Sequence, residues 1–198
     1  MSKVVRFHEH GGPEQLRIED LEVADPGAGE VRIRVEAIGL NRSEAMFRAG
    51  AYIKALKFPS PIGYEGVGIV EALGPAVQGF AAGDRVCVLP NFRLGDYGIY
   101  AERAIVPARS LIAPPPGLTA VEAASIWMQY FTALAIYETA HATVGDHIII
   151  RAASSSVGFT CSKAPRAVRY ISGKATAVAA ITVAGQEKTM VMPICSSA

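Results

Sequence analysis

Cysteine is scarce in this chain, and neither sign of charge dominates. Of the 198 residues, only Cys87, Cys161 and Cys195 are cysteines. Three scattered cysteines cannot supply the disulfide framework of a small secreted domain. The formal net charge is +1, so electrostatics gives no reason to expect nucleic acid or an anionic membrane surface as a partner.

A long uninterrupted apolar run is also lacking. The most apolar long segment, 120–140, contains Glu122, Gln129 and Glu138, whereas a membrane-spanning helix needs about 20 mostly apolar residues. The first residues of the chain have no apolar stretch of the kind found in signal peptides. We therefore expect a cytoplasmic protein that does not enter the membrane.

The first recognisable pattern is a strand from Glu30 to Ala37. Charged residues alternate there with Val31, Ile33 and Val35, which puts the apolar side chains on one face of a half-buried strand. We expect shorter strands at 4–7, 15–18, 66–73, 85–89 and 100–106, and a short helix at 43–49. Short strands separated by glycine and proline predict a compact, mostly β, barrel-like domain. It would end at the proline-rich segment 113–117.

The pattern changes after this segment. Thr119 and Glu122 have the spacing of a capping box, and a helical stretch of about 20 residues, with room for one break, follows as far as Ala140. A run of isoleucines then predicts a strand at 147–152 that is buried on both faces, as in a parallel sheet. The expected order is β domain, helix, buried strand and a loop of small residues.

That loop, 153–158, directly follows the buried strand. Dinucleotide-binding folds use small residues there because backbone amides at a helix N-terminus can then approach a pyrophosphate. In the G-x-G-x-x-G spacing only Gly158 matches, and no acidic residue stands about 20 positions further on, so an ordinary turn is the alternative. Pro165 would fall in the second turn of the helix that should follow, so we expect no intact helix. Further on, 175–183 fits either a strand or a short helix.

Two polar residues occupy positions where function and structure compete as explanations. Asn41 follows the best-predicted strand and is either an N-cap of the short helix or a donor to a cofactor or substrate. Glu65 stands among three glycines at the start of a strand. It is expected to be either a buried carboxylate with an arginine partner or a residue that faces solvent.

Metal and serine-hydrolase chemistry find little support in the sequence. Zinc needs three or four converging ligands, and the chain contains no C-x-x-C. His8 and His10 lie on one side of an extended segment and could hold a metal together, although two surface histidines beside a turn usually hold none. The G-x-S-x-G elbow of a serine hydrolase is absent.

Six motifs occur together in one order over residues 1–158. They are Phe7–Glu14, Gly39–Glu44, Gly63–Gly68, Gly83–Val86, Trp127–Ala133 and Ala152–Gly158. In this combination the sequence resembles the medium-chain dehydrogenase/reductase superfamily, specifically its zinc-independent branch near the quinone reductases.

The resemblance implies a fold and a cofactor. Residues 1–117 would form a GroES-like catalytic domain, and 118–158 the first helix, strand and loop of an incomplete Rossmann domain with NADPH in the cleft. The tail, 159–198, does not resemble the family. Zinc-bearing relatives have a cysteine where this chain has Asn41 or Arg42 and a histidine where it has Tyr64, so the resemblance implies no zinc.

The resemblance also implies a reaction, namely hydride transfer from the nicotinamide to a quinone, an enone or an aldehyde. Asn41 and Tyr52 would then be the catalytic residues, near the nicotinamide and the substrate. Glu65 would support the site rather than react. The cofactor-binding residues would be Asn41, Thr132, Ser155, Ser156, Val157 and Gly158.

Only 40 residues follow Gly158, which is too few for a complete Rossmann domain with its six strands. Family members are usually homodimers, and the dimer-forming strands would be missing here. We therefore expect a truncated or frameshifted product with little or no activity. The alternatives are a non-enzymatic GroES-like binding module and a fragment of a zinc-dependent, alcohol dehydrogenase-like protein.

Overall fold

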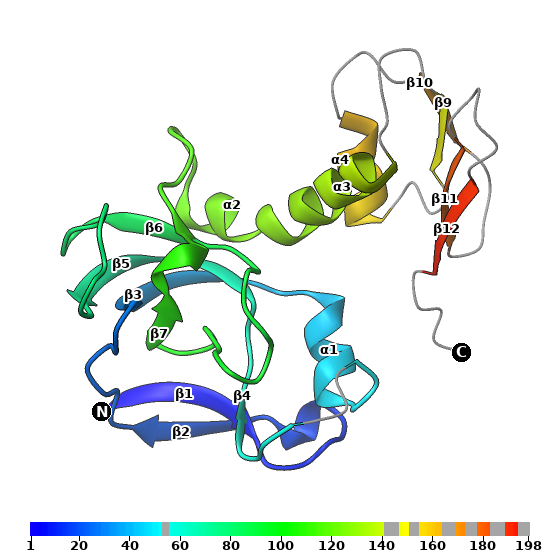
Figure 1. The fold of residues 1–198 in the computed structure, drawn as a ribbon. Coiled ribbons are helices and arrows are strands. Elements are labelled where there is room, and N and C mark those ends of the chain that lie inside the picture. The colour runs from blue at the N-terminus through cyan, green and yellow to red at the C-terminus, as the bar shows by residue number, and fades with distance from the viewer. Residues whose placement is uncertain are drawn as a thin grey trace. The chain divides into compact units, whose positions relative to one another are not determined.

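The computed structural model describes residues 1–52, 56–140, 147–150, 155–163, 169–172, 178–182 and 189–193. The chain divides into two compact units, Met1–Met128 and Gln129–Ala198. The first unit is mostly β, and the second contains both helices and strands, as predicted (Figure 1).

Two antiparallel sheets build the first unit. The larger has the strand order β7-β3-β5-β6-β8, and the smaller has the order β2-β1-β4. Figure 1 shows the two sheets on opposite sides of this unit, with α1 beside them. The strands of the larger sheet are β3 (Glu30–Gly39), β5 (Glu65–Leu73), β6 (Arg85–Val88), β7 (Arg103–Pro107) and β8 (Leu111–Ile112); those of the smaller are β1 (Ser2–Phe7), β2 (Arg17–Leu21) and β4 (Ser60–Pro61).

The predicted alternation of β3 is confirmed. Val31 and Ile33 are fully buried, and Val35 and Ala37 are half-buried. Val31 and Ile33 belong to a core cluster that also contains valines of β5, β6 and β7. The larger sheet therefore packs its apolar face inward around β3.

The short strands predicted in the first unit are present with bounds that differ by one to three residues, and β4 and β8 were not predicted. The strand expected at 15–18 begins instead at Arg17, because Pro13–Gln15 forms a short 3₁₀ turn. Proline favours the first position of a helical turn, where its missing N–H is not needed. A second 3₁₀ turn, Ala108–Ser110, follows β7.

The short helix α1 (Arg42–Arg48) is held by a buried glutamate. Glu44 is 3% exposed, and its Oε2 accepts hydrogen bonds of 2.7 Å from the backbone N–H of Asn41 and from the phenol of Tyr100. Phe47, on the same helix, is fully buried and packs edge-on against Phe7 of β1. These contacts fix α1 against β1 and against the segment that contains Tyr100.

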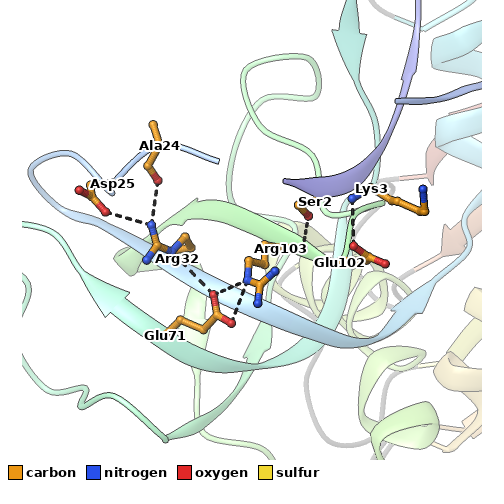
Figure 2. Close-up of polar contacts among 8 residues, drawn as sticks. All are labelled: Ser2, Lys3, Ala24, Asp25, Arg32, Glu71, Glu102 and Arg103. Atoms are coloured by element: carbon orange, nitrogen blue, oxygen red, sulfur yellow. Dashed lines mark hydrogen bonds and ion pairs between the residues drawn. The ribbon is translucent and has the colours of Figure 1, made fainter. Parts of the chain in front are cut away.

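A charged cluster ties the larger sheet together on its outer side (Figure 2). Glu71 of β5 accepts hydrogen bonds of 2.9 and 3.0 Å from Nε of Arg103 on β7, and Nε of Arg32 on β3 lies 3.7 Å away. The N–H of Arg103 also donates to the hydroxyl of Ser2, which links β7 to the smaller sheet. Because these ion pairs are partly exposed, each contributes at most about 1 kcal/mol.

The capping box predicted at residues 119–122 is present. The N–H of Thr119 donates to Glu122 at 2.9 Å, and Oγ1 of Thr119 accepts from the N–H of Glu122 at 3.3 Å. The helical stretch is broken once, into α2 (Ala120–Ala124) and α3 (Trp127–Ala140). Ala123 and Ala124 of α2 pack on the β sheet, so α2 and the first two residues of α3 belong to the first unit.

The second unit contains a strand–helix–strand segment. Strand β9 (His147–Ile150) pairs in parallel with β10 (Arg169–Ser172), and α4 (Ser156–Lys163) lies between them in the chain. The expectation of no intact helix was wrong: α4 begins at Ser156, so two turns are complete before Pro165. Strands β11 (Val178–Thr182) and β12 (Thr189–Pro193) pair antiparallel, which confirms the strand alternative for 175–183.

Among the helices in the described ranges, none is both long enough and apolar enough to cross a membrane.

Replacing Gly98 by alanine is expected to destabilise the first unit by about 1–3 kcal/mol. A Cβ at Gly98 would lie 2.6 Å from the backbone N and O of Ile62 and 2.7 Å from Cβ of Pro61, and backbone atoms cannot yield cheaply. Gly27→Ala is the control, because its Cβ would meet only the end of the Glu30 side chain, at 3.1 Å, and no backbone atom. Urea unfolding followed by tryptophan fluorescence measures both; equal losses would contradict the steric argument.

Glu44 is expected to make stability depend on pH. Burial raises the pKa of its carboxyl, and the hydrogen bonds from Tyr100 and Asn41 only partly oppose this. The folded protein therefore holds this proton more tightly than the unfolded chain does. The stabilisation is fully present below about pH 4.3, the ordinary glutamate value, and is lost as pH rises through the folded-state pKa.

Within that window, wild type should lose about 1.4 kcal/mol of unfolding free energy per pH unit relative to Glu44→Gln, which does not titrate. Urea unfolding of both proteins at steps between pH 4 and pH 7 checks this. If the difference in unfolding free energy between wild type and Glu44→Gln stays constant from pH 4 to pH 7, the expectation is contradicted.

Candidate active site

Asn41 lies at the junction of β3 and α1, and two carboxylates hold it. Its backbone is extended, with φ −125° and ψ 147°, as suits the residue before a helix. Its backbone N–H donates to Glu44, and its side-chain Nδ2 donates to Oε1 of Glu65 at 2.9 Å. Asn41 is thus the N-cap of α1, as one of the two alternatives predicted. Its side chain points toward Glu65.

Glu65 is buried, with 1% of its surface exposed, at the first position of β5. Its Oε1 accepts from Asn41, and its Oε2 accepts from the backbone N–H of Met128 at 2.8 Å. The buried carboxylate of the first alternative is thus confirmed, and the solvent-facing alternative is wrong. The hydrogen bonds to Glu65 come from an amide side chain and a backbone amide.

The space for the Glu65 carboxylate comes from the glycine opposite it. Gly39, the last residue of β3, pairs with Glu65 across the ladder. A Cβ at Gly39 would lie 2.6 Å from Oε1 of Glu65 and 2.4 Å from the carbonyl oxygen of Ala124. No side chain fits there without displacing the carboxylate or α2, which explains a glycine at this position.

Aromatic side chains gather around Tyr64, the residue before Glu65. Tyr64 is half-buried and packs edge-on against Phe92, with ring centroids 5.3 Å apart, and Phe92 packs likewise against Tyr97. Tyr52 is 50% exposed. Burial raises the pKa of the Tyr64 phenol, and an electrostatic effect of Tyr52 raises it further.

The structure therefore brings Asn41 and Glu65 together, and Tyr64 precedes Glu65 in the chain. The sequence did not identify Met128, Tyr100 or Glu44 as neighbours of these residues. No local pattern could have identified them, because Glu44 and Tyr100 are 56 positions apart in the chain, and Glu65 and Met128 are 63 apart.

The other predicted cofactor residues lie in the second unit. Thr132 is half-buried on α3. Ser155 caps α4, since its Oγ accepts from the N–H of Gly158 at 3.0 Å. Within the first turn of α4, Ser156 is exposed, Val157 is half-buried and Gly158 is buried. A helix N-terminus therefore follows β9, although residues 151–154 of the predicted loop lie outside the described residues.

No metal centre is found in the part of the chain that the structure describes, where no three His, Cys, Asp or Glu residues cluster suitably. His8 lies 2.5 Å from a carboxylate oxygen of Glu19, while Nδ1 of His10 contacts the carbonyl oxygen of Arg48. The two histidines thus have separate partners. Burial raises the pKa of the Cys87 thiol, which disfavours the thiolate that a metal or a nucleophilic reaction needs.

Comparison with known proteins agrees with this fold. Residues 27–116 match the family model of the alcohol dehydrogenase GroES-like domain. A quinone oxidoreductase of Pseudomonas aeruginosa is 37% identical over 163 residues, which cover 81% of this chain and 49% of the relative. The chain spans about half the length of the curated relatives it matches.

Solved structures give the same result. A quinone oxidoreductase of Pseudomonas syringae superposes with a TM-score of 0.77 at 32% identity, covering 87% of this chain and 52% of that one. The Escherichia coli quinone oxidoreductase, solved in complex with NADPH, has a TM-score of 0.75 at 28% identity and covers 86% and 52% respectively. Residues 27–116 therefore form an alcohol dehydrogenase GroES-like domain, and the sequence and fold are similar to those of the quinone oxidoreductases in the medium-chain dehydrogenase/reductase superfamily.

Proposed function

We propose that this protein serves NADPH-dependent reduction of a small molecule, by hydride transfer to a quinone, an enone or an aldehyde. The observation that carries the proposal is the β9–α4–β10 segment, with a serine-capped helix between two parallel strands. Parallel strands joined through a helix form the unit that binds mononucleotides in dinucleotide-binding folds. The similar quinone oxidoreductases support the same reading.

The cofactor pyrophosphate would bind at the start of α4. The first four N–H groups of a helix lack partners within it, and the helix dipole favours an anion there. Ser155 accepts from the N–H of Gly158, and Ser156 and Val157 would offer their backbone N–H groups to the phosphates. The buried Gly158 adds no side chain that would obstruct the approach. The residues present therefore fit an anionic group of this kind.

Bound NADPH would supply the hydride. Asn41 and Tyr52 would orient the acceptor carbonyl and donate hydrogen bonds to its oxygen as negative charge develops there. Such donors are effective when they are already held in place before the reaction, and the bond from Asn41 to Glu65 provides this. Thr132 would contact the nicotinamide side of the cofactor. The protein thus supplies positioning and electrostatics rather than the redox step.

A negative charge at the start of α4 is expected to weaken NADPH binding without unfolding the helix. Ser156→Asp places a carboxylate beside the phosphates, and like charges about 4 Å apart at a partly exposed site repel by on the order of 1–4 kcal/mol. The dissociation constant should therefore rise at least about fivefold. The same carboxylate interacts favourably with the helix dipole, by about 0.3–1 kcal/mol, so α4 should remain folded.

Isothermal titration of NADPH into the full chain checks this, with Ser156→Asn as the matched neutral control. Equal affinity of the Asp and Asn variants would contradict the pyrophosphate position. Failure of the wild-type chain to bind NADPH would contradict the proposed function itself.

Turnover by the 198-residue chain is expected to be slow, because it spans about half the length of its relatives. Oxidation of NADPH with a quinone, followed by absorbance at 340 nm, should give a rate below about 1 s⁻¹, the lower end of ordinary enzyme turnover. Asn41→Ala should abolish any residual rate. Turnover within the ordinary range would show that this chain is a complete catalyst.

A further inference from the structure

Both oxygens of the Glu65 carboxylate accept a hydrogen bond inside the first unit. Oε1 accepts from Nδ2 of Asn41 at 2.9 Å, and Oε2 accepts from the N–H of Met128 at 2.8 Å. Asn41 precedes α1, whereas Met128 is the second residue of α3. One side chain of β5 thus joins two segments that are 87 positions apart in the sequence.

The bond to Asn41 determines how the amide is oriented. The oxygen and nitrogen of an asparagine amide differ little in shape, so partners decide which atom points where. A carboxylate only accepts hydrogen bonds, so the NH2 group of Asn41 must face Glu65. The amide oxygen is then left to accept, and the capping box of α1 joins it to the backbone N–H of Glu44.

The bond to Met128 has a different consequence. The first N–H groups of a helix have no acceptor within it, and a buried one without a partner is costly. Oε2 of Glu65 provides that acceptor in the first turn of α3, and its negative charge also suits a helix N-terminus. Glu65, the first residue of β5, therefore caps the start of α3.

We propose that Glu65 is a positioning residue that fixes the side-chain amide of Asn41 and the first turn of α3 with the two oxygens of one carboxylate. The consequence for ligand binding rests on the proposed function. The pair of hydrogen bonds that Glu65 accepts from Asn41 and Met128, called the Glu65 joint below, does not depend on it. Glutamine is a poor substitute because it has one acceptor oxygen, and its NH2 group would meet one of the two donors.

A double-mutant cycle on the full chain tests this proposal. Glu65→Gln and Asn41→Ala should each weaken NADPH binding by roughly tenfold. If Glu65 acts through Asn41, the double variant should bind about as weakly as either single variant, because the second change has nothing left to disturb. An NADPH dissociation constant that rises roughly a hundredfold in the double variant, the product of two independent effects, would overturn the proposal.

Glu71→Gln is the matched control, because it makes the same change on the same strand in the ion-pair cluster of Figure 2. It should leave NADPH affinity within about twofold of wild type. If Glu65→Gln does not fold, Glu65→Asp takes its place in the cycle. Aspartate keeps the charge but is one methylene too short to reach both donors.

The joint can also be tested without a ligand. Trp127 is the only tryptophan of the chain and precedes Met128. Glu65→Gln should shift its fluorescence to longer wavelength as the start of α3 loosens, whereas Asn41→Ala, which leaves the bond to Met128 intact, should not. Unchanged emission in Glu65→Gln would overturn the capping role.

These measurements separate the two hypotheses. If wild type binds no NADPH, the proposed function fails, and the same cycle is run on the unfolding equilibrium constant in urea. If Glu65 positions Asn41, the change in the unfolding equilibrium constant of the double variant should be clearly smaller than the product of the changes caused by Glu65→Gln and Asn41→Ala alone. Independent effects would overturn the positioning role as well.

Discussion

Gly39 and Glu65 face each other at the end of the antiparallel ladder between β3 and β5, and the candidate site depends on this register. The ladder brings the residues after β3, including Asn41, beside the first residue of β5. A shift of one position would turn every side chain of β5 to the opposite face. Such a shift is disfavoured because β3 buries Val31 and Ile33 in the core.

The same part of the unit contains two buried carboxylates, Glu44 and Glu65. Removing a carboxylate from water is unfavourable unless hydrogen bonds replace its hydration. Backbone amides, the side chain of Asn41 and the phenol of Tyr100 provide these bonds. Burial and the Glu44 carboxylate in turn raise the pKa of Tyr100, so its phenol remains a donor. The network thus gives Asn41 hydrogen-bond partners on both its backbone and its side chain.

Patterns confined to a few neighbouring residues predicted structure well. The alternation in β3 and the capping box at Thr119 arise from local geometry, and both are present. The error over α4 was also local. The helix was expected to start later, so that Pro165 would interrupt its second turn, but the cap at Ser155 starts it early enough to complete two turns.

The sequence by itself determined the alternation of β3, the capping box at Thr119 and the family motifs, because each depends on residues close together in the chain. Tertiary structure alone decided the partners of Glu65. Its donors come from positions 24 residues before it and 63 residues after it. A buried carboxylate binds whichever donors the packing of strands and helices brings within reach, and a sequence pattern does not contain that information.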